Sequence, residues 1–221
     1  MEVQETPRLF DAKAQIATRE RALRAGYEGG GDFLMRRAAL GLAERLSDVT
    51  RSFPTAVLAG TGAGAVAEAL PMAMTDGGAG FTMTDPSPGM LTAAARRLPN
   101  AKPRAWEGET LPFARASADL ALSAGLLHWL EDPVGHLVQL RFALRPDGLL
   151  LAVLPGGQTL AALRSALAMA EAEVTGGLSP RVAPMGKISF AGPCSGTRAP
   201  VISRMPALVQ KLAGRAKLRS A

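Results

Sequence analysis

From Ala56 onward, short apolar segments alternate with stretches of helical periodicity, and this alternation restricts the fold more than any other feature of the sequence. Strands are expected at Ala56–Ala59, Gly80–Thr84, Pro103–Trp106, Ala118–Ser123 and Leu149–Leu154. The helices after them are expected to end at Leu70 and to span Ser87–Leu98, Pro133–Leu144 and Gly157–Val174. Apolar strands that alternate with helices indicate a parallel sheet covered on both faces. The sequence therefore predicts an α/β fold with a Rossmann-like, doubly wound, mostly parallel sheet.

The first 55 residues have the periodicity of helices rather than strands. Helices are expected near Asp11–Ala25 and Phe33–Val49, on either side of a glycine-rich break, with Asp32 as the N-cap of the second. We therefore expect an N-terminal helical extension over residues 1–55, a ligand-binding domain over 56–185 and an atypical tail over 186–221.

The tail differs from the rest of the chain in charge. It holds seven basic and no acidic residues from Lys187 onward, so the other 18 Lys and Arg (25 less 7) nearly balance the 19 Asp and Glu. A balanced main domain argues against specific nucleic-acid binding, which needs clustered positive charge. No strand pair is expected in the tail, only an amphipathic stretch near Ala207–Leu218, and its composition suits a truncation or an altered reading frame.

A glycine-rich turn, Gly60-Thr61-Gly62-Ala63-Gly64, joins the first expected strand to the helix that follows it. Glycines at such a turn allow a ligand to approach the backbone, and the helix N-terminus beyond offers free N–H groups. Asp85 ends the next strand, where a carboxylate can accept hydrogen bonds from both hydroxyls of a ribose. Read as G-x-G-x-x-A through Ala65, the turn also fits a dinucleotide site, and a tight turn without any ligand remains an alternative.

Further motifs follow in order: Glu107-Gly108-Glu109-Thr110-Leu111-Pro112-Phe113, Ser123-Ala124-Gly125-Leu126-Leu127-His128-Trp129 and Leu144-Arg145-Pro146-Asp147-Gly148. With the glycine turn and Asp85, this set resembles the type 11 group of class I S-adenosylmethionine-dependent methyltransferases. The resemblance implies S-adenosylmethionine as the cofactor and methyl transfer to an unknown small-molecule or protein acceptor as the activity.

A closer resemblance covers most of residues 8–185, through Leu9-Phe10-Asp11, Arg51-Ser52-Phe53-Pro54, Gly156-Gly157-Gln158-Thr159-Leu160 and the segment 176–184. These motifs look like the subgroup that contains the methyltransferase-like mitochondrial complex I assembly factor, which is associated with arginine hydroxylation. The resemblance thus implies a second function, namely that the protein binds S-adenosylmethionine and helps to assemble respiratory complex I. Its partner would then be a subunit of that complex. We expect a cytoplasmic location, with a peripheral position at the inner membrane as the alternative, and no transmembrane segment.

The resemblance also assigns roles to residues. Glycines of the turn would border the methionine and ribose of the cofactor, and Asp85 would hold the ribose hydroxyls. Glu107 would accept a hydrogen bond from the adenine amino group. Ser123 would lie where the pocket opens toward the acceptor. The implied cofactor-binding residues are Gly60, Gly62, Gly64, Asp85, Glu107 and Ser123. Leu58 stands where the family has an acid that orients the amino end of the cofactor. Lower affinity, or a cofactor-deficient remnant of the family, is therefore a third hypothesis.

The remaining polar candidates carry weaker expectations. His128 is the candidate base, although it and Trp129 are more readily interpreted as part of a pocket wall. His136 is expected within a helix at the surface or at the edge of the core. Two histidines without a nearby cluster of acids do not predict a metal site, and Cys194 in the tail is not expected to be catalytic.

Overall fold

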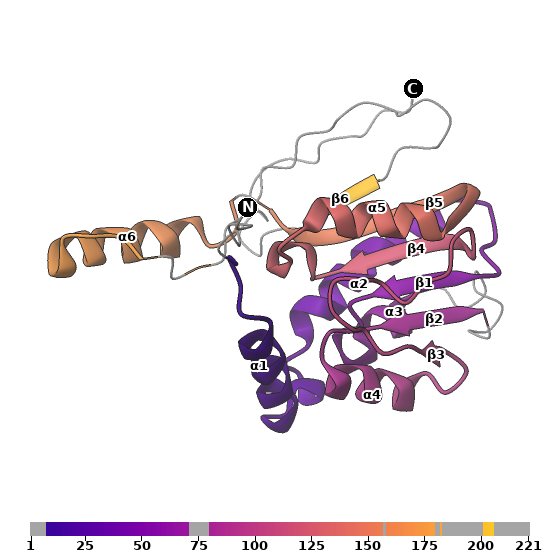
Figure 1. Cartoon of the computed structure of the whole chain (residues 1–221), viewed down its shortest axis with the longest axis horizontal. Helices are drawn as coiled ribbons and strands as arrows, with labels where there is room; N and C mark the ends of the chain where they lie inside the picture. Colours follow the sequence, from indigo (N-terminus) through magenta and orange to yellow (C-terminus); the bar gives the residue numbers. More distant parts are fainter. Residues whose placement is uncertain (1–7, 71–79, 157, 180–181, 183–200, 206–221) are drawn as a thin grey trace, which may run out of the picture.

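A computed structural model describes residues 8–70, 80–156, 158–179, 182 and 201–205, and its six strands form one sheet. The strands are β1 (Ala56–Ala59), β2 (Phe81–Thr84), β3 (Lys102–Pro103), β4 (Ala118–Ala124), β5 (Leu144–Pro155) and β6 (Val201–Met205). They run in the order β3-β2-β1-β4-β5-β6, and every neighbouring pair is parallel (Figure 1). The predicted Rossmann-like parallel sheet is confirmed. Because the chain moves outward from β1 in both directions, a crevice is expected beyond the carboxyl ends of β1 and β4.

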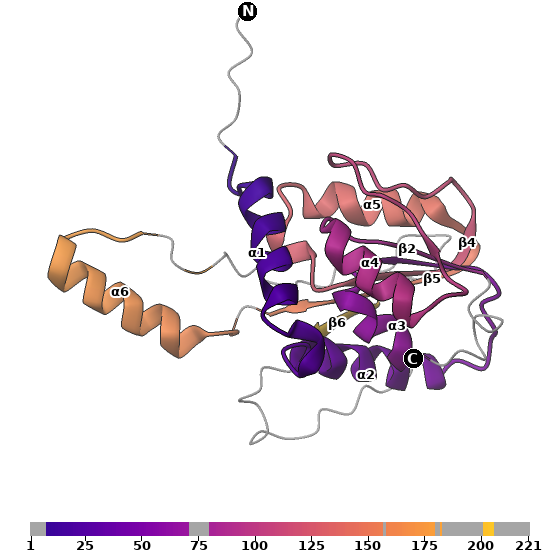
Figure 2. The ribbon, with the colours of Figure 1, turned by 90° about the horizontal axis from the view of Figure 1, so that it is seen from below.

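Helices cover both faces of this sheet, as Figure 2 shows with the sheet seen nearly edge-on between α5 and α2. The helices are α1 (Ala12–Arg24), α2 (Phe33–Ser47), α3 (Ala65–Ala69), α4 (Pro88–Arg97), α5 (Pro133–Ala143) and α6 (Ala161–Thr175). Leu58 of β1 faces a core formed with α2, α3 and α4. Its neighbours Val57 and Ala59 face the opposite core, where α5 contributes Leu140. This alternation explains why β1 had to be apolar on both faces.

Three features of the sheet differ from the sequence prediction. β3 has only two residues, because the chain after Pro103 leaves the sheet. β5 begins at Leu144, before the expected start at Leu149, and passes Asp147 (φ +64°) with a register shift against β4. Such a bulge lets a strand continue through a segment that looks like a turn in sequence. The tail contributes one strand that the sequence did not predict, β6, which pairs with the outer edge of β5.

Helix α6 projects away from the rest of the fold in both ribbon views (Figures 1 and 2). None of its residues is buried. Cys194 and the expected amphipathic stretch Ala207–Leu218 lie outside the described residues. Among the residues that are described, no helix is both long and apolar enough to span a membrane.

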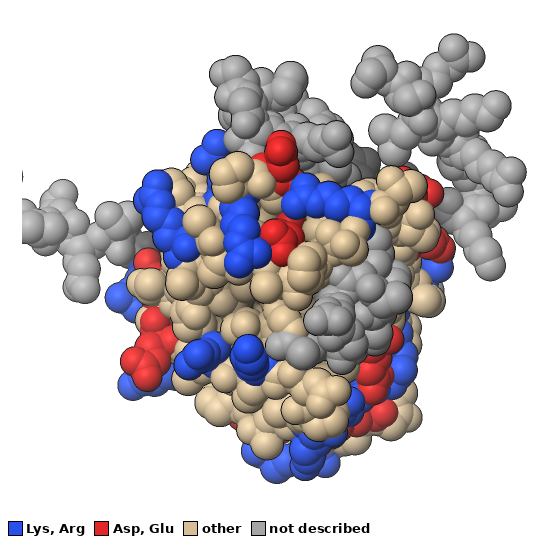
Figure 3. Space-filling view, turned by 90° about the vertical axis from the view of Figure 1, so that its right-hand side faces the viewer, with Lys and Arg blue, Asp and Glu red and all other residues tan. Residues whose placement is uncertain are grey.

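The amino ends of the strands lie opposite the crevice, on the face seen in Figure 3, where Lys and Arg side chains lie among Asp and Glu. One contact between an acidic and a basic side chain at this end of the sheet involves Asp119. Asp119 of β4 accepts hydrogen bonds from Thr55 and from Arg145, and although burial alone would raise the pKa of its carboxyl, these bonds lower it. This contact links the start of β4 to Thr55, directly before β1, and to Arg145 of β5.

Candidate functional site

The glycine turn between β1 and α3 has a backbone conformation that glycine suits best. Gly60, Gly62 and Gly64 have φ angles of +88°, +52° and +96°, and Ala63 between them has +54°. Side chains are disfavoured at positive φ, so three glycines in five residues allow the chain to bend sharply after β1. The whole turn is buried, which places its backbone at the carboxyl edge of the sheet.

Other parts of the protein lie close to the position where each of these glycines would carry a side chain. A β-carbon on Gly60 would lie 2.2 Å from the carbonyl oxygen of Ala124, and one on Gly64 would lie 3.0 Å from Arg97. A β-carbon on Gly62 would lie 3.2 Å from Met35 of α2. Close packing thus gives each glycine a structural reason of its own, beside any contact with a ligand.

Asp85 directly follows β2, and its carboxylate points toward the glycine turn. One oxygen, Oδ2, accepts from the backbone N–H of Thr61 at 2.8 Å and lies 3.0 Å from the Thr61 hydroxyl. The other, Oδ1, accepts from the backbone N–H of Ser87 at 3.0 Å. Asp85 is buried, with Arg19 of α1 as the nearest cation, 3.8 Å from Oδ1. The structure therefore brings together the two features that sequence spacing predicted to meet.

Helix α1 forms a roof over this edge of the sheet. Glu20 accepts from the hydroxyl of Ser87 at 2.6 Å and from the backbone N–H of Gly89 at 2.8 Å, and these bonds lower the pKa of its carboxyl. Gln15 donates to the carbonyl of Trp129 at 3.0 Å. The N-terminal extension is thus part of the site, because it is bonded to the segments that follow β2 and β4.

Two cavities lie beneath this roof. The larger, of about 550 Å³, is lined by Arg19, Met35, Gly125 and His128 among others. The smaller, of about 250 Å³, is lined by Pro86, Trp106, Glu109 and His136 among others. Phe10, Gln15 and Trp129 line both cavities, so the two spaces adjoin on either side of the same residues.

The smaller cavity contains unpaired polar atoms in its wall. The rings of Trp106 and His136 stack with their centres 5.6 Å apart, and both Trp106 Nε1 and His136 Nδ1 are buried without a hydrogen-bond partner among the described residues. His136 Nε2 lies 3.1 Å from the hydroxyl of Ser123. Because buried polar atoms are normally hydrogen-bonded, the two free nitrogens suggest that a polar ligand completes this wall.

The structure places His136 differently from the sequence prediction. It lies within helix α5 as expected, but it is buried, not at the surface. Burial lowers the pKa of its imidazole to about 4. Ser123 is also buried and does not line either of the two cavities, so its predicted position where the pocket opens stays a prediction.

Two further side chains predicted for the site are those of His128 and Glu107. His128 lines the larger cavity, its Nδ1 has no hydrogen-bond partner, and burial together with the charge of Arg19 lowers its pKa to about 4. Glu107 is exposed and forms only a backbone bridge to Thr110, while Glu109 beside it lines the smaller cavity.

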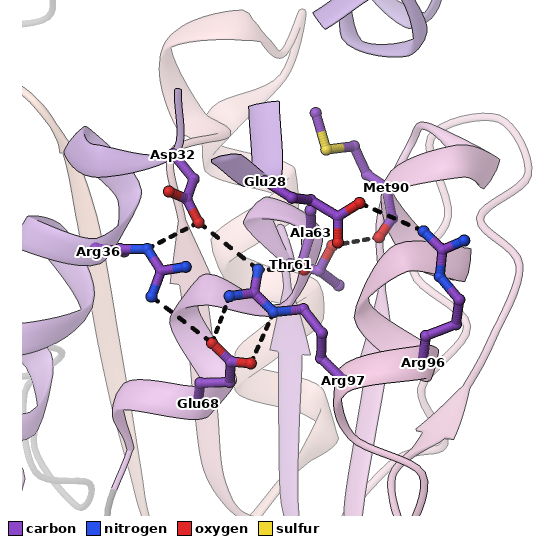
Figure 4. Close-up of polar contacts among 9 residues, drawn as sticks. All are labelled: Glu28, Asp32, Arg36, Thr61, Ala63, Glu68, Met90, Arg96 and Arg97. Carbon is purple, nitrogen blue, oxygen red and sulfur yellow. Dashed lines mark hydrogen bonds and ion pairs between the residues drawn. The ribbon is translucent and has the colours of Figure 1, made fainter. Parts of the chain in front are cut away.

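An ion-pair network stabilises the outer side of the glycine turn (Figure 4). Arg97 of α4 donates to the carbonyl of Ala63 at 2.9 Å and forms two bonds with Glu68 at 2.7 and 2.6 Å. Asp32 occupies the N-cap position of α2, but its side chain does not cap the helix. Instead its buried carboxylate lies 2.9 Å from Arg36 and 3.6 Å from Arg97. The predicted N-cap position of Asp32 is confirmed, but its carboxylate pairs with these cations instead of the N–H groups of the helix terminus.

Sequence motifs did not identify Arg19, Met35, Trp106 or His136 as site residues. Arg19 and Met35 come from the N-terminal helices, which have no fixed spacing from the glycine turn. Trp106 directly precedes the motif that begins at Glu107, and this position was the only signal available for it.

Comparison with known proteins agrees with this geometry. Residues 57–152, which include the glycine turn and Asp85, match a family described as a methyltransferase domain. The chain is 33% identical to the mitochondrial arginine-hydroxylase NDUFAF5 of Danio rerio over 161 residues, which cover 73% of this chain and 49% of the relative. The human protein of the same name is 30% identical over 187 residues, 85% of this chain and 53% of the relative.

A shorter match, 47% identical over 66 residues, is to the malonyl-[acyl-carrier protein] O-methyltransferase of Xylella fastidiosa (strain M23), covering 30% of this chain and 22% of that one. A SAM-dependent methyltransferase of known structure from Aquifex aeolicus has a TM-score of 0.41 at 23% identity, over 47% of this chain and 57% of its own. The chain spans about half the length of the arginine-hydroxylases that it matches.

Proposed function

Because residues 57–152 form a class I methyltransferase domain close to the arginine-hydroxylase subgroup, we propose that this chain binds S-adenosylmethionine and transfers its methyl group. The observation that carries the proposal is the buried carboxylate of Asp85, which is bonded to the glycine turn and directly precedes Pro86 in the wall of the smaller cavity.

The acceptor sites of Asp85 fit a ribose. A carboxylate offers about four acceptor positions, and three are taken by the backbone of Thr61, the hydroxyl of Thr61 and the backbone of Ser87. The Thr61 hydroxyl also lies 3.3 Å from the carbonyl of Met90. If it turns to that carbonyl, two positions on Asp85 become available, one for each ribose hydroxyl.

The adenine ring would then enter the smaller cavity, which Pro86 lines directly after Asp85. Its ring nitrogens can accept from Trp106 Nε1 when the base lies at the edge of the indole. The neutral His136 can present either a donor or an acceptor at Nδ1. Glu107 and the backbone beside it remain the proposed partners of the adenine amino group.

The amino-acid end of the cofactor would point toward the larger cavity. Leu58 is fully buried in the core and offers it no acid. Arg19 must move away for a ribose to reach Asp85. We therefore expect the amino-acid end to be bound more weakly than the adenosine part.

In methyl transfer, S-adenosylmethionine supplies a methyl group on a positively charged sulfur. The residues of this chain have to align donor and acceptor and keep water out, which the roof formed by α1 favours. His128 faces the larger cavity, where an acceptor would lie. With a pKa of about 4 it is neutral at pH 7, so it can accept a hydrogen bond from the acceptor but is a weak base.

Calorimetric titration with S-adenosylhomocysteine tests the proposal. We expect Asp85→Ala to weaken binding at least tenfold, or by about 1.4 kcal/mol, because the ribose loses charge-assisted hydrogen bonds. Asp119→Ala is the matched control, since this residue is also a buried aspartate but lies at the opposite end of the strands, and its loss should leave the affinity unchanged. Absence of heat with the wild-type chain at millimolar ligand would favour a cofactor-deficient remnant.

A second candidate function comes from the relatives named arginine-hydroxylases, which match across most of this chain. On this alternative the larger cavity accepts an arginine side chain of a protein partner, such as a subunit of respiratory complex I. Pull-down of complex I assembly intermediates from cells expressing the tagged chain distinguishes the two functions. A cytoplasmic location, or a peripheral one at the inner membrane, stays a prediction.

A further inference from the structure

The crevice between the ends of β1 and β4 is filled by one flexible side chain. Met35 lies in the first turn of α2 and reaches between Gly62, which follows β1, and Gly125, which follows β4. A β-carbon on Gly62 would be 3.2 Å from both Cβ and Cγ of Met35, and one on Gly125 would be 2.9 Å from its sulfur. The two backbone segments that a ligand would approach at this point are therefore already covered.

The position of this side chain matters because β1 and β4 are neighbours at the switch point of the sheet. Ala59 pairs with Ser123, so the segments carrying Gly62 and Gly125 leave the sheet side by side. Ligands of such sheets bind in the crevice at this point. On the proposed function, the ribose lies on the Asp85 side, and the amino-acid part of the cofactor would have to enter the space that Met35 occupies.

The chemistry of this space also disfavours a charged amino-acid end. Leu58, directly below the turn, is buried in the apolar core, and Met35 adds a thioether where a carboxylate would be needed to bind an ammonium group. A buried ammonium without a partner is strongly disfavoured. Methionine is unbranched and flexible, so it can fill the space tightly and still be displaced.

We infer that Met35 occupies the amino-acid subsite and is a specificity-determining residue, so that the chain selects adenine thioether nucleosides by their adenosine part alone. This inference rests on the proposed function, because it assumes that the adenosine part binds at Asp85. It implies that a ligand lacking the amino-acid part binds as well as one that has it.

The test compares two probes, S-adenosylhomocysteine and 5′-methylthioadenosine, which share the adenosine and the thioether but differ in the amino-acid part. Calorimetry is done on the wild-type chain and on Met35→Ala, Met35→Leu and Met169→Ala. Leucine keeps the bulk of the side chain, and Met169 is an exposed methionine on α6 that controls for loss of a methionine elsewhere. Thermal melting checks that each variant is folded.

We expect the two probes to bind the wild-type chain within about threefold of each other, because Met35 blocks the contacts that the amino-acid part would make with the segments of Gly62 and Gly125. Met35→Ala should raise the affinity for S-adenosylhomocysteine at least about fivefold and leave that for 5′-methylthioadenosine unchanged, while the other two variants behave as wild type. A preference for S-adenosylhomocysteine of more than about tenfold in the wild-type chain, unchanged in Met35→Ala, would overturn the inference and leave the proposed function intact. Failure of both probes to bind any folded variant would contradict both.

Discussion

Asp32 and Asp85 are both buried near the glycine turn, yet their carboxylates are stabilised in different ways. Asp32 is paired with two cations, Arg36 at 2.9 Å and Arg97 at 3.6 Å. Asp85 is stabilised by neutral donors, and its nearest cation is 3.8 Å away. A carboxylate held by neutral donors can exchange one of them for a ligand hydroxyl, whereas separating Asp32 from its cations would leave a buried charge unpaired. Only Asp85 is therefore suited to binding.

The burial of His136 predicts a dependence of stability on pH. Its pKa is about 4 in the folded chain, against 6.5 when exposed, so below pH 6.5 the unfolded chain binds a proton that the folded chain does not. The contribution of His136 to the free energy of unfolding is thus at its full value above pH 6.5. It should fall by up to about 1.4 kcal/mol per pH unit between 6.5 and 4.

Urea unfolding of the wild-type chain and of His136→Gln across this pH range measures the effect. Glutamine can still contact the Ser123 hydroxyl but does not titrate, so the variant should lose less stability on acidification than the wild type. His128 titrates in the same range and remains in both proteins, which cancels its contribution. Identical pH profiles for the two proteins would show that His136 is not held neutral by burial.

Local sequence signals predicted some residue roles well and others poorly. The helix expected over Ser87–Leu98 is confirmed as α4 with these two residues as its caps, and the Ser87 side chain accepts from the N–H of Met90, three residues away. The positions of Asp32 and His136 on their helices were predicted, but their side-chain contacts were not, since these depend on Arg97 and Trp106, which are distant in sequence. The same limit applies to Arg19 and Met35, which reach the site through the packing of helices.

At the scale of elements, the glycine turn depends on α4. Arg97 binds the carbonyl of Ala63, a residue with positive φ, and also Glu68 in α3 (Figure 4). We expect Arg97→Ala to lower the free energy of unfolding by about 2–3 kcal/mol, because Asp32 and the Ala63 carbonyl lose a buried partner. Binding of S-adenosylhomocysteine should weaken as well, because the turn is less well ordered.

Arg96 is the natural control for this variant. It is the preceding residue of the same helix, but it is exposed and bonds only to Glu28, at 3.3 Å. Arg96→Ala should therefore change the free energy of unfolding by less than about 1 kcal/mol. Chemical denaturation of both variants gives the comparison, and equal losses would mean that the contact with the turn is not what makes Arg97 important.

Elements defined by local pattern were predicted more accurately than those defined by pairing. The apolar run of β1 has the predicted bounds, because burial on both faces leaves a clear signal. The bulged start of β5 and the strand β6 follow from pairing with a neighbouring strand, and neither has a distinctive composition. For the same reason the sequence indicated a site at the end of β1 but not the helices that roof it.

At the scale of the whole molecule, α6 stands apart. It has no buried residue and projects from the fold (Figure 1), so its stability depends on its own hydrogen bonds. Isolated helices of this length are marginal in water. Hydrogen exchange should therefore be at least about a hundredfold faster in α6 than in β4, whose residues are all buried. Equal protection of the two would indicate that α6 packs against a surface.

The site as a whole joins the N-terminal helices to the sheet. Arg19, Gln15 and Glu20 of α1 contact the segments after β2 and β4, and both cavities lie between these parts. The proposed cofactor would extend across both cavities with its ribose at Asp85. The central claim is therefore spatial, namely that one nucleoside connects the smaller cavity to the glycine turn.

A crystal structure of the chain with S-adenosylhomocysteine tests this claim most directly. We predict that both ribose hydroxyls lie within hydrogen-bond distance of the Asp85 carboxylate, with the adenine ring beside Trp106 in the smaller cavity and Arg19 displaced. A nucleoside bound elsewhere, with Asp85 still covered by Arg19, would contradict the account.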